Sequence, residues 1–279
     1  MTNLSLGQLD RWRSDMPQTD ERANELADFV EVRARSIDEV KTRQAYLDLL
    51  ELRPSERVID VGAGSGVVTR DIARRLRPGG SVLAVDSNFR LMELGRRLAE
   101  EQGVGEVIEW REGDARRLPV EDSAFDVVVC ATVLAHIPDS DAVVRELMRV
   151  LRPGGRIGVF EIDPESFMIA HPDRVMTRRI LAAATDYGFA NALVSRRLPG
   201  LMKAAGVADL QTRAFTSLET EASGFVARAA ALRPVVAAQT GAITQAEGDA
   251  WLAQLRAEMD AGRFLGGTTY IFAWGTKPA

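Results

Sequence analysis

Apolar residues along this chain recur in two patterns, one typical of strands and one typical of helices. Short apolar runs that predict strands lie at about 57–61, 81–85, 107–112, 125–131 and 156–162. Segments with helical spacing separate most of them, at about 68–75, 89–102 and 141–151. The run 125–131 is apolar at nearly every position, which is typical of a parallel strand buried on both faces. The pattern predicts an α/β fold with a doubly wound parallel sheet.

The segments on either side of this α/β region are mainly helical in pattern. Beyond Asp163, helices are expected around 174–187, after 196, at 220–238 and at 244–261, and strands at 208–216 and 267–276. Before the first strand, we expect a mobile arm or short helices at 1–25 and helical segments at 24–40 and 38–52. We interpret residues 1–53 as an N-terminal helical arm or lid. Residues 54–279 then form one domain with cap inserts at about 164–200 and 220–262.

The turn between the first strand and its helix carries the strongest sign of ligand binding. It reads D-V-G-A-G-S-G from Asp60 to Gly66. Glycines allow a ligand to approach the backbone, and the helix N-terminus behind them offers free N–H groups and a positive dipole end. A nucleotide-like ligand is therefore expected here. The dinucleotide fingerprint G-x-G-x-x-G would need its third glycine at Val67, which makes an NAD-dependent dehydrogenase the weaker interpretation.

Composition narrows the classes of function. The 279 residues are 46% hydrophobic and 27% charged, which fits a globular protein with a sizeable core. The net charge of −5 argues against a broad nucleic-acid-binding surface, so no nucleic-acid partner is expected. Cys130 is the single cysteine, and no metal site is expected. No apolar run approaches the roughly 18 residues of a membrane span. We expect a cytoplasmic monomer or homodimer.

Three motifs together resemble the class I S-adenosylmethionine (SAM)-dependent methyltransferases. They are the acid-x-G-x-G-x-G form of the turn at 60–66, the Gly113-Asp114-Ala115 turn, and the Leu-Arg-Pro-Gly-Gly-Arg turn before the fifth strand. The sequence is most similar to the ubiquinone/menaquinone-biosynthesis type over about 55–163. The resemblance implies a Rossmann-like sheet of seven strands in the order 3-2-1-4-5-7-6, with the last strand antiparallel, and SAM as cofactor. It also implies methyl transfer to a small metabolite, and the aromatic residues of the cap suggest an apolar or aromatic one.

The resemblance assigns parts of SAM to particular residues. The glycine turn would hold the methionyl part, Asp86 the ribose hydroxyls and Asp114 the adenine amino group, with Leu91 packed on the adenine face. Alternatively, Asp86 caps a helix and Asp114 only closes its own turn. The expected cofactor-binding residues are Asp60, Gly62, Ala63, Gly64, Asp86, Ser87, Leu91, Asp114, Ala115 and Thr132.

Two residues after neighbouring strands are candidates for a catalytic base. His136 follows the fourth strand and Asp163 follows the fifth, and imidazole exchanges a proton near neutral pH. His136 could instead brace its own loop. His171 is expected to be structural. Arg33 and Arg35 could pair with the SAM carboxylate, although for each alone a solvated helix charge is the simpler interpretation.

Two expectations concern the molecule as a whole. The recognised motifs serve binding, so the chain could alternatively be a SAM-binding protein that does not methylate, such as a regulator or a catalyst of another SAM-dependent reaction. We also expect the segments 24–52, 164–200 and 220–262 to form one lid over the strand ends. The acceptor would then lie between lid and core, with His136 and Asp163 facing it from below.

Overall fold

The computed structural model describes residues 7–13 and 15–279, and its centre is a seven-stranded sheet. The strands are β1 (Arg57–Val61), β2 (Ser81–Asp86), β3 (Ile108–Glu112), β4 (Phe125–Ala131), β5 (Leu151–Ile169), β6 (Ala208–Glu219) and β7 (Gly266–Thr276). Their order is β3-β2-β1-β4-β5-β7-β6, and β7 runs antiparallel to both of its neighbours. The predicted fold class, strand order and direction are confirmed.

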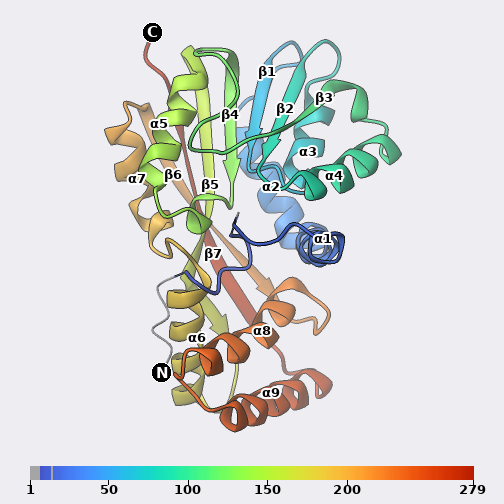
Figure 1. The fold of residues 1–279 in the computed structure, drawn as a ribbon, viewed down its shortest axis with the longest axis vertical. Helices are drawn as coiled ribbons and strands as arrows, with labels where there is room; N and C mark the ends of the chain where they lie inside the picture. The colour runs from blue at the N-terminus through green and yellow to red at the C-terminus, as the bar shows by residue number, and fades with distance from the viewer. Residues whose placement is uncertain (1–6, 14) are drawn as a thin grey trace.

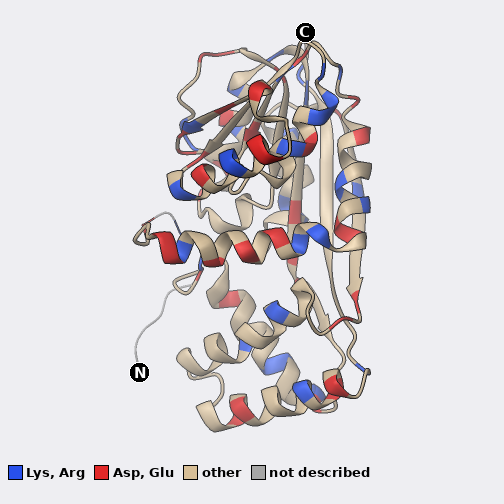
Figure 2. Cartoon of the chain, turned by 90° about the vertical axis from the view of Figure 1, so that its right-hand side faces the viewer, with Lys and Arg blue, Asp and Glu red and all other residues tan. Residues whose placement is uncertain are grey.

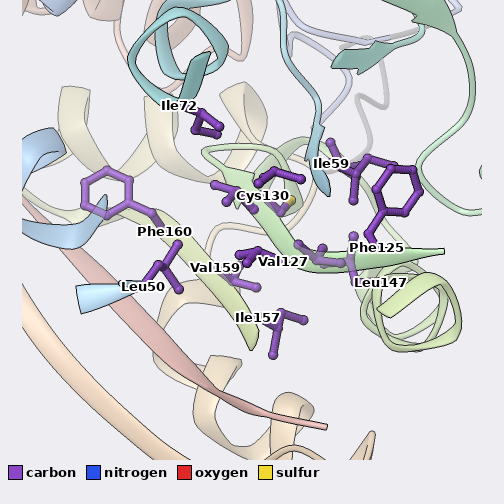
Figure 3. Packing of buried hydrophobic residues seen from close by; sticks show 14 of the residues in the cluster. Leu50, Ile59, Ile72, Phe125, Val127, Cys130, Leu147, Ile157, Val159 and Phe160 are labelled. Atoms are coloured by element: carbon purple, nitrogen blue, oxygen red, sulfur yellow. The ribbon is translucent and has the colours of Figure 1, made fainter. Parts of the chain in front are cut away.

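Helices cover both faces of this sheet (Figure 1). They are α2 (Ile37–Leu49), α3 (Val67–Arg75), α4 (Phe89–Glu101), α5 (Ser140–Val150) and α7 (Val194–Ala204), with short 3-10 turns at Gly105–Val107 and Leu134–His136. Apolar side chains from the strands and these helices form the main core, part of which Figure 3 shows around Ile59, Cys130 and Val159. The unbroken apolar run of β4 is buried because helices lie on both sides of it.

Two strands, β5 and β6, extend well beyond their predicted ends. β5 was expected to end at residue 162 but continues to Ile169, where it still pairs with Gly266 of β7. β6 likewise extends to Glu219. Both strands continue past the ends of the other strands into the helical cap, which occupies the lower part of Figure 1. They can continue because Phe167 packs into a second hydrophobic cluster there.

The cap has its own hydrophobic core. It consists of α6 (Arg174–Gly188), α8 (Phe225–Gln239) and α9 (Gln245–Asp260) around Phe167, Ile180 and Trp251. His171 stacks on Trp251 and contacts the Trp251 carbonyl oxygen through Nε2 at 3.1 Å. Its Nδ1 accepts the backbone N–H of Asp173, so His171 is structural, as expected.

The predicted lid segments divide between cap and core. α1 (Asp20–Arg35) lies between the sheet and the cap, and its Ala23 and Leu26 pack against Leu91 of α4. By contrast, Tyr46 of α2 stacks on Phe160 at 4.6 Å, and α7 buries Leu198 in the main core. Acidic residues predominate along α1 as far as Glu31, and Arg33 and Arg35 lie in its last turn (Figure 2). In the described part of the chain, no helix is long and apolar enough to cross a membrane.

Gly66 begins α3 in a conformation that side chains disfavour. Its φ is +76°, in the left-handed region. A Cβ at this position would lie 2.4 Å from Cη2 of Trp110, and a Cβ on Gly95 would lie 2.7 Å from the same atom. The indole edge is therefore held between two glycines, so it has little room to move away from a new methyl group.

We expect Gly66→Ala to lower the free energy of unfolding by about 2–5 kcal/mol, combining about 1–2 for the left-handed backbone with about 1–3 for overpacking. Gly206→Ala is the matched control, because Gly206 has φ +90° but nothing within 4 Å of its Cβ position. Gly206→Ala should lower the free energy of unfolding only by the part that comes from the left-handed backbone, about 1–2 kcal/mol. Urea unfolding followed by circular dichroism measures both, and equal losses would contradict the contact with Trp110.

Candidate functional site

A cavity of about 380 Å³ opens at the carboxyl ends of β1, β2 and β4. This edge is where open α/β sheets bind ligands. The cavity is lined by the strand ends and by residues of α1, α6, α8 and the N-terminal segment 7–13. All the predicted cofactor-binding residues line it: Asp60, Gly62, Ala63, Gly64, Asp86, Ser87, Leu91, Asp114, Ala115 and Thr132.

The glycine turn presents open backbone to this cavity. The N–H groups of Gly62 and Ala63 both donate to the Val85 carbonyl, at 2.8 and 3.0 Å, which fixes the turn against β2. Gly64 has φ +54°, and nothing lies within 4 Å of the position that its Cβ would take. A ligand group can therefore approach the backbone at Gly64.

Asp86 lies at the end of β2 and faces the same space. Its Oδ2 accepts the N–H of Gly64 at 2.8 Å, and its Oδ1 accepts the N–H of Asn88 at 2.8 Å. Burial raises the pKa of this carboxyl. Asn88, not Asp86, is the N-cap residue of α4, because its side chain accepts the N–H of Leu91. A carboxylate has about four acceptor positions, and these backbone groups do not fill all of them, so Asp86 can still accept from a ribose hydroxyl.

Asp60 is held within the protein rather than free for a ligand. It is almost completely buried and accepts a 2.5 Å hydrogen bond from the Thr69 hydroxyl, which ties β1 to α3. Burial raises the pKa of Asp60 to about 7. Its position and bonding make it a residue that fixes the geometry of the glycine turn.

Asp114 lines the cavity but is already paired. Its carboxylate accepts from Nε of Arg116 at 3.0 and 3.1 Å and from Nη2 at 2.7 Å. These hydrogen bonds lower the pKa of Asp114. Both side chains are about half exposed, so the ion pair is worth about 0–1 kcal/mol and can rearrange around a ligand.

The loop after β4 is positioned by a residue that the sequence pattern did not reveal. Glu161 of β5 is fully buried, and its Oε1 accepts the N–H groups of Val133 and Leu134, both at 2.7 Å. Burial raises the pKa of Glu161 to about 7. Thr132, just before these residues, has φ +57°. The sequence did contain a sign of this role, because Glu161 is an acidic residue within the otherwise apolar run of β5.

His136 in this loop is paired with a second residue that sequence reasoning missed. Its Nδ1 lies 2.8 and 3.0 Å from the two carboxylate oxygens of Asp10, which is buried. Because a carboxylate can only accept, Nδ1–H donates to Asp10, and Nε2 is the ring nitrogen that Asp10 does not engage. Asp10 also accepts the N–H of Trp12. The two partners lie 126 positions apart, so no local pattern connects them.

The other candidates separate into residues inside and outside the cavity. Asp163 does not line it and instead pairs with Nε of Arg196 on α7 at 3.0 Å. Arg33 lines it and donates from Nη2 to the Thr132 hydroxyl at 3.4 Å. Arg35 is exposed. Asp163 faces away because side chains alternate along a strand, and Ile162 takes the cavity side.

An ion pair attaches α1 to the glycine turn. Glu31 accepts from the Ser65 hydroxyl at 2.9 Å and from Nη2 of Arg70 at 2.9 and 3.0 Å. Arg70 also donates from Nη1 to the Ser65 carbonyl. α1 is therefore fixed to the sheet half of the site. Among the described residues, no group of three or more His, Cys, Asp or Glu side chains could hold a metal ion.

Comparison with known proteins agrees with this geometry. The methyltransferase domain family matches residues 59–159. An uncharacterized 37.1 kDa protein of transposon TN4556 from Streptomyces fradiae is 35% identical over 60% of this chain and 47% of its own length. The ubiquinone/menaquinone biosynthesis C-methyltransferase UbiE of Hahella chejuensis is 36% identical over 41% of this chain and 46% of its own. The chain thus spans about half the length of these curated relatives.

A solved structure shares the fold over almost the whole chain. Phosphoethanolamine N-methyltransferase 2 of Haemonchus contortus, in complex with SAM, aligns with 94% of this chain and 58% of its own. The TM-score is 0.56 at 17% identity, so this likeness concerns the fold alone. The matched region, the strand order and the glycine turn agree with one another, and residues 59–159 form a methyltransferase domain of the class I SAM-dependent type.

Proposed function

We propose that this protein binds SAM in the cavity and transfers its methyl group to a small metabolite. The observation that supports this most strongly is the convergence of residues from four separate loops and one helix on one cavity. The ends of β1, β2, β3 and β4, with the loops that follow them, contribute predicted cofactor-binding residues, and the start of α4 contributes Leu91. A cavity of this size lies within the usual range for small-molecule sites, about 300–1,000 Å³.

The residues on the sheet side of the cavity would hold the cofactor. In this proposal Asp86 accepts from the ribose hydroxyls, and the turn at Gly62–Gly64 lies against the methionyl part. Leu91 and Asp114 contact the adenine. Arg33 is a partner for the cofactor carboxylate, because it lines the cavity and guanidinium suits carboxylate geometry.

The reaction needs alignment, a dry site and a base. SAM supplies a methyl group on a cationic sulfonium, which is already activated. The lid in this proposal consists of segment 7–13, α1, α6 and α8, which all line the cavity and exclude water from it. His136 Nε2 is the base where the acceptor carries a proton, and Asp10 holds the imidazole in the tautomer that this role needs.

The cap side of the cavity selects the acceptor. Aromatic side chains from several elements line it, namely Trp12, Phe29, Phe167, Phe189 and Phe225. Phe29 and Phe225 meet edge to face at 4.9 Å. Such a wall favours an acceptor with an apolar or aromatic body. Asp163 has no part in this proposal, because it lies outside the cavity.

The first prediction concerns the identity of the cofactor. We expect SAM and S-adenosylhomocysteine to bind to the purified protein, whereas NAD does not, because Val67 replaces the third glycine of the dinucleotide fingerprint. Isothermal titration calorimetry with the three ligands measures this. NAD binding in the absence of SAM binding would refute the proposal.

The second prediction concerns Asp86. We expect Asp86→Asn to weaken S-adenosylhomocysteine binding by about 1.5–3 kcal/mol, or about 10- to 150-fold, because an amide is a poorer acceptor than a carboxylate for ribose hydroxyls. Asparagine keeps an oxygen for the N–H of Gly64 or Asn88. Glu112→Gln is the control, because Glu112 ends the neighbouring strand and does not line the cavity. Similar affinities in both variants would exclude Asp86 from the ribose site.

The third prediction concerns His136 and Asp10. We expect His136→Gln to reduce methyl transfer by about 10²–10⁴-fold, the usual contribution of a general base, and Asp10→Asn to reduce it as well. S-adenosylhomocysteine affinity should stay within about twofold of wild type, because neither side chain belongs to the proposed cofactor contacts. The measurement is tritium transfer from methyl-labelled SAM into a metabolite extract.

The outcomes of that assay separate the remaining interpretations. Full transfer by His136→Gln would leave His136 with the role of bracing its loop. Tight SAM binding without any transfer by the wild-type protein would favour a SAM-binding protein that does not methylate.

A further inference from the structure

Arg233 is the most unusual charged residue of the cap. It lies on α8, in the wall of the cavity opposite the strand ends, and only 7% of it is exposed. Its guanidinium lies over the ring of Phe167, 3.7 Å from the ring centroid. Ala229 and Val236, one turn away on the same helix, line the cavity beside it and add no polar group.

No described residue neutralises this charge. Arg233 makes no hydrogen bond or ion pair to the part of the chain that the structure describes, and its Nε is buried without an acceptor. Burial lowers the pKa of Arg233 to about 9, and no carboxylate in residues 7–13 and 15–279 opposes that effect. The other buried arginine beside the site, Arg70, is paired with Glu31. Arg228, on the exposed side of α8, pairs with Asp28.

A buried guanidinium without an anion destabilises a fold, because the desolvation of its charge is not compensated. Stacking on Phe167 compensates only in part. The exposed part of the side chain opens into the cavity, because Arg233 lines it while its surroundings are apolar. The missing partner is therefore best supplied by a ligand.

We propose that Arg233 binds a carboxylate group of the methyl acceptor, which would thus be a carboxylic acid with an apolar or aromatic body. This inference rests on the proposed function. A guanidinium and a carboxylate match in charge and form two parallel hydrogen bonds. A carboxylate carries a single negative charge, which the single guanidinium of Arg233 balances without a second cation.

Binding at Arg233 would also orient the acceptor. The carboxylate lies at the cap wall, and Thr132 and His136 line the sheet side of the same cavity. An acceptor anchored at one end therefore presents its other end to the loop after β4. Arg233 acts in this scheme as a specificity-determining residue, distinct from the residues proposed for the cofactor.

The test uses the full chain saturated with S-adenosylhomocysteine and two pairs of probes. Phenylacetate and octanoate are the carboxylates, and phenylacetamide and octanamide are their neutral counterparts. We expect calorimetry to show that wild type binds at least one carboxylate about thirty-fold or more tightly than its amide, as loss of a buried charge partner implies. Arg233→Met should reduce the carboxylate to the affinity of the amide. Arg228→Met is the matched control on the same helix and should behave as wild type.

A melting experiment without ligand gives an independent readout. Arg233→Met should raise the melting temperature, because it removes an unpaired buried charge and keeps the apolar bulk. A purely structural arginine would instead lower it. Phenylacetate or octanoate should raise the melting temperature of wild type and not that of Arg233→Met.

Two results would overturn the inference directly: equal binding of acid and amide by wild type, or an unchanged carboxylate affinity in Arg233→Met. A loss of S-adenosylhomocysteine binding in Arg233→Met would also overturn it, because it would assign Arg233 to the cofactor. The wild-type comparison stands even where the variant fails to fold. Failure of wild type to bind S-adenosylhomocysteine, with an Arg233-dependent carboxylate site retained, would refute the proposed function but not the anion site.

Discussion

The site depends on a strand-to-helix turn that only glycines can form in this environment. Gly62, Gly64 and Gly66 all have positive φ, and each is constrained differently by its surroundings. A Cβ on Gly62 would overlap Val133, and a Cβ on Gly66 would overlap Trp110, whereas the space beside Gly64 is open. Two of the glycines therefore allow the turn to pack against the loop after β4 and against β3, and the third leaves room for a ligand.

Buried carboxylates then fix the backbone around this turn. Asp60 ties β1 to α3, Asp86 holds the N–H of Gly64, and Glu161 holds two N–H groups of the loop after β4. Burial raises the pKa of all three carboxyls, so each is held at a cost in desolvation that its hydrogen bonds offset. The carboxyl ends of β1, β2 and β4 are thus rigid before a ligand arrives, which favours binding because less ordering remains to be done.

The second half of the site comes from the extension of the sheet into the cap. β5, β6 and β7 continue past the other strands and connect two hydrophobic clusters. One surrounds the strands of the sheet, and the other lies among α6, α8 and α9. The cavity lies between these clusters. Its sheet side carries acids and open backbone, and its cap side carries aromatic rings and Arg233. This polarity suits a cofactor on one side and an apolar acid on the other.

The sequence by itself determined the α/β alternation, the strand order through the resemblance, and the residues that line the sheet side of the cavity. These features follow from local patterns: β-branched runs make strands, and the glycine turn and Asp86 lie within or directly after a strand. The tertiary structure decided what depends on partners far apart in the chain. It paired His136 with Asp10 and Asp163 with Arg196, and it placed α2 in the core rather than the lid. It also left Arg233 without a counter-charge among the residues that the structure describes. Spacing along the chain cannot reveal such features, because the pairing and burial of a charge depend on which helix packs beside it.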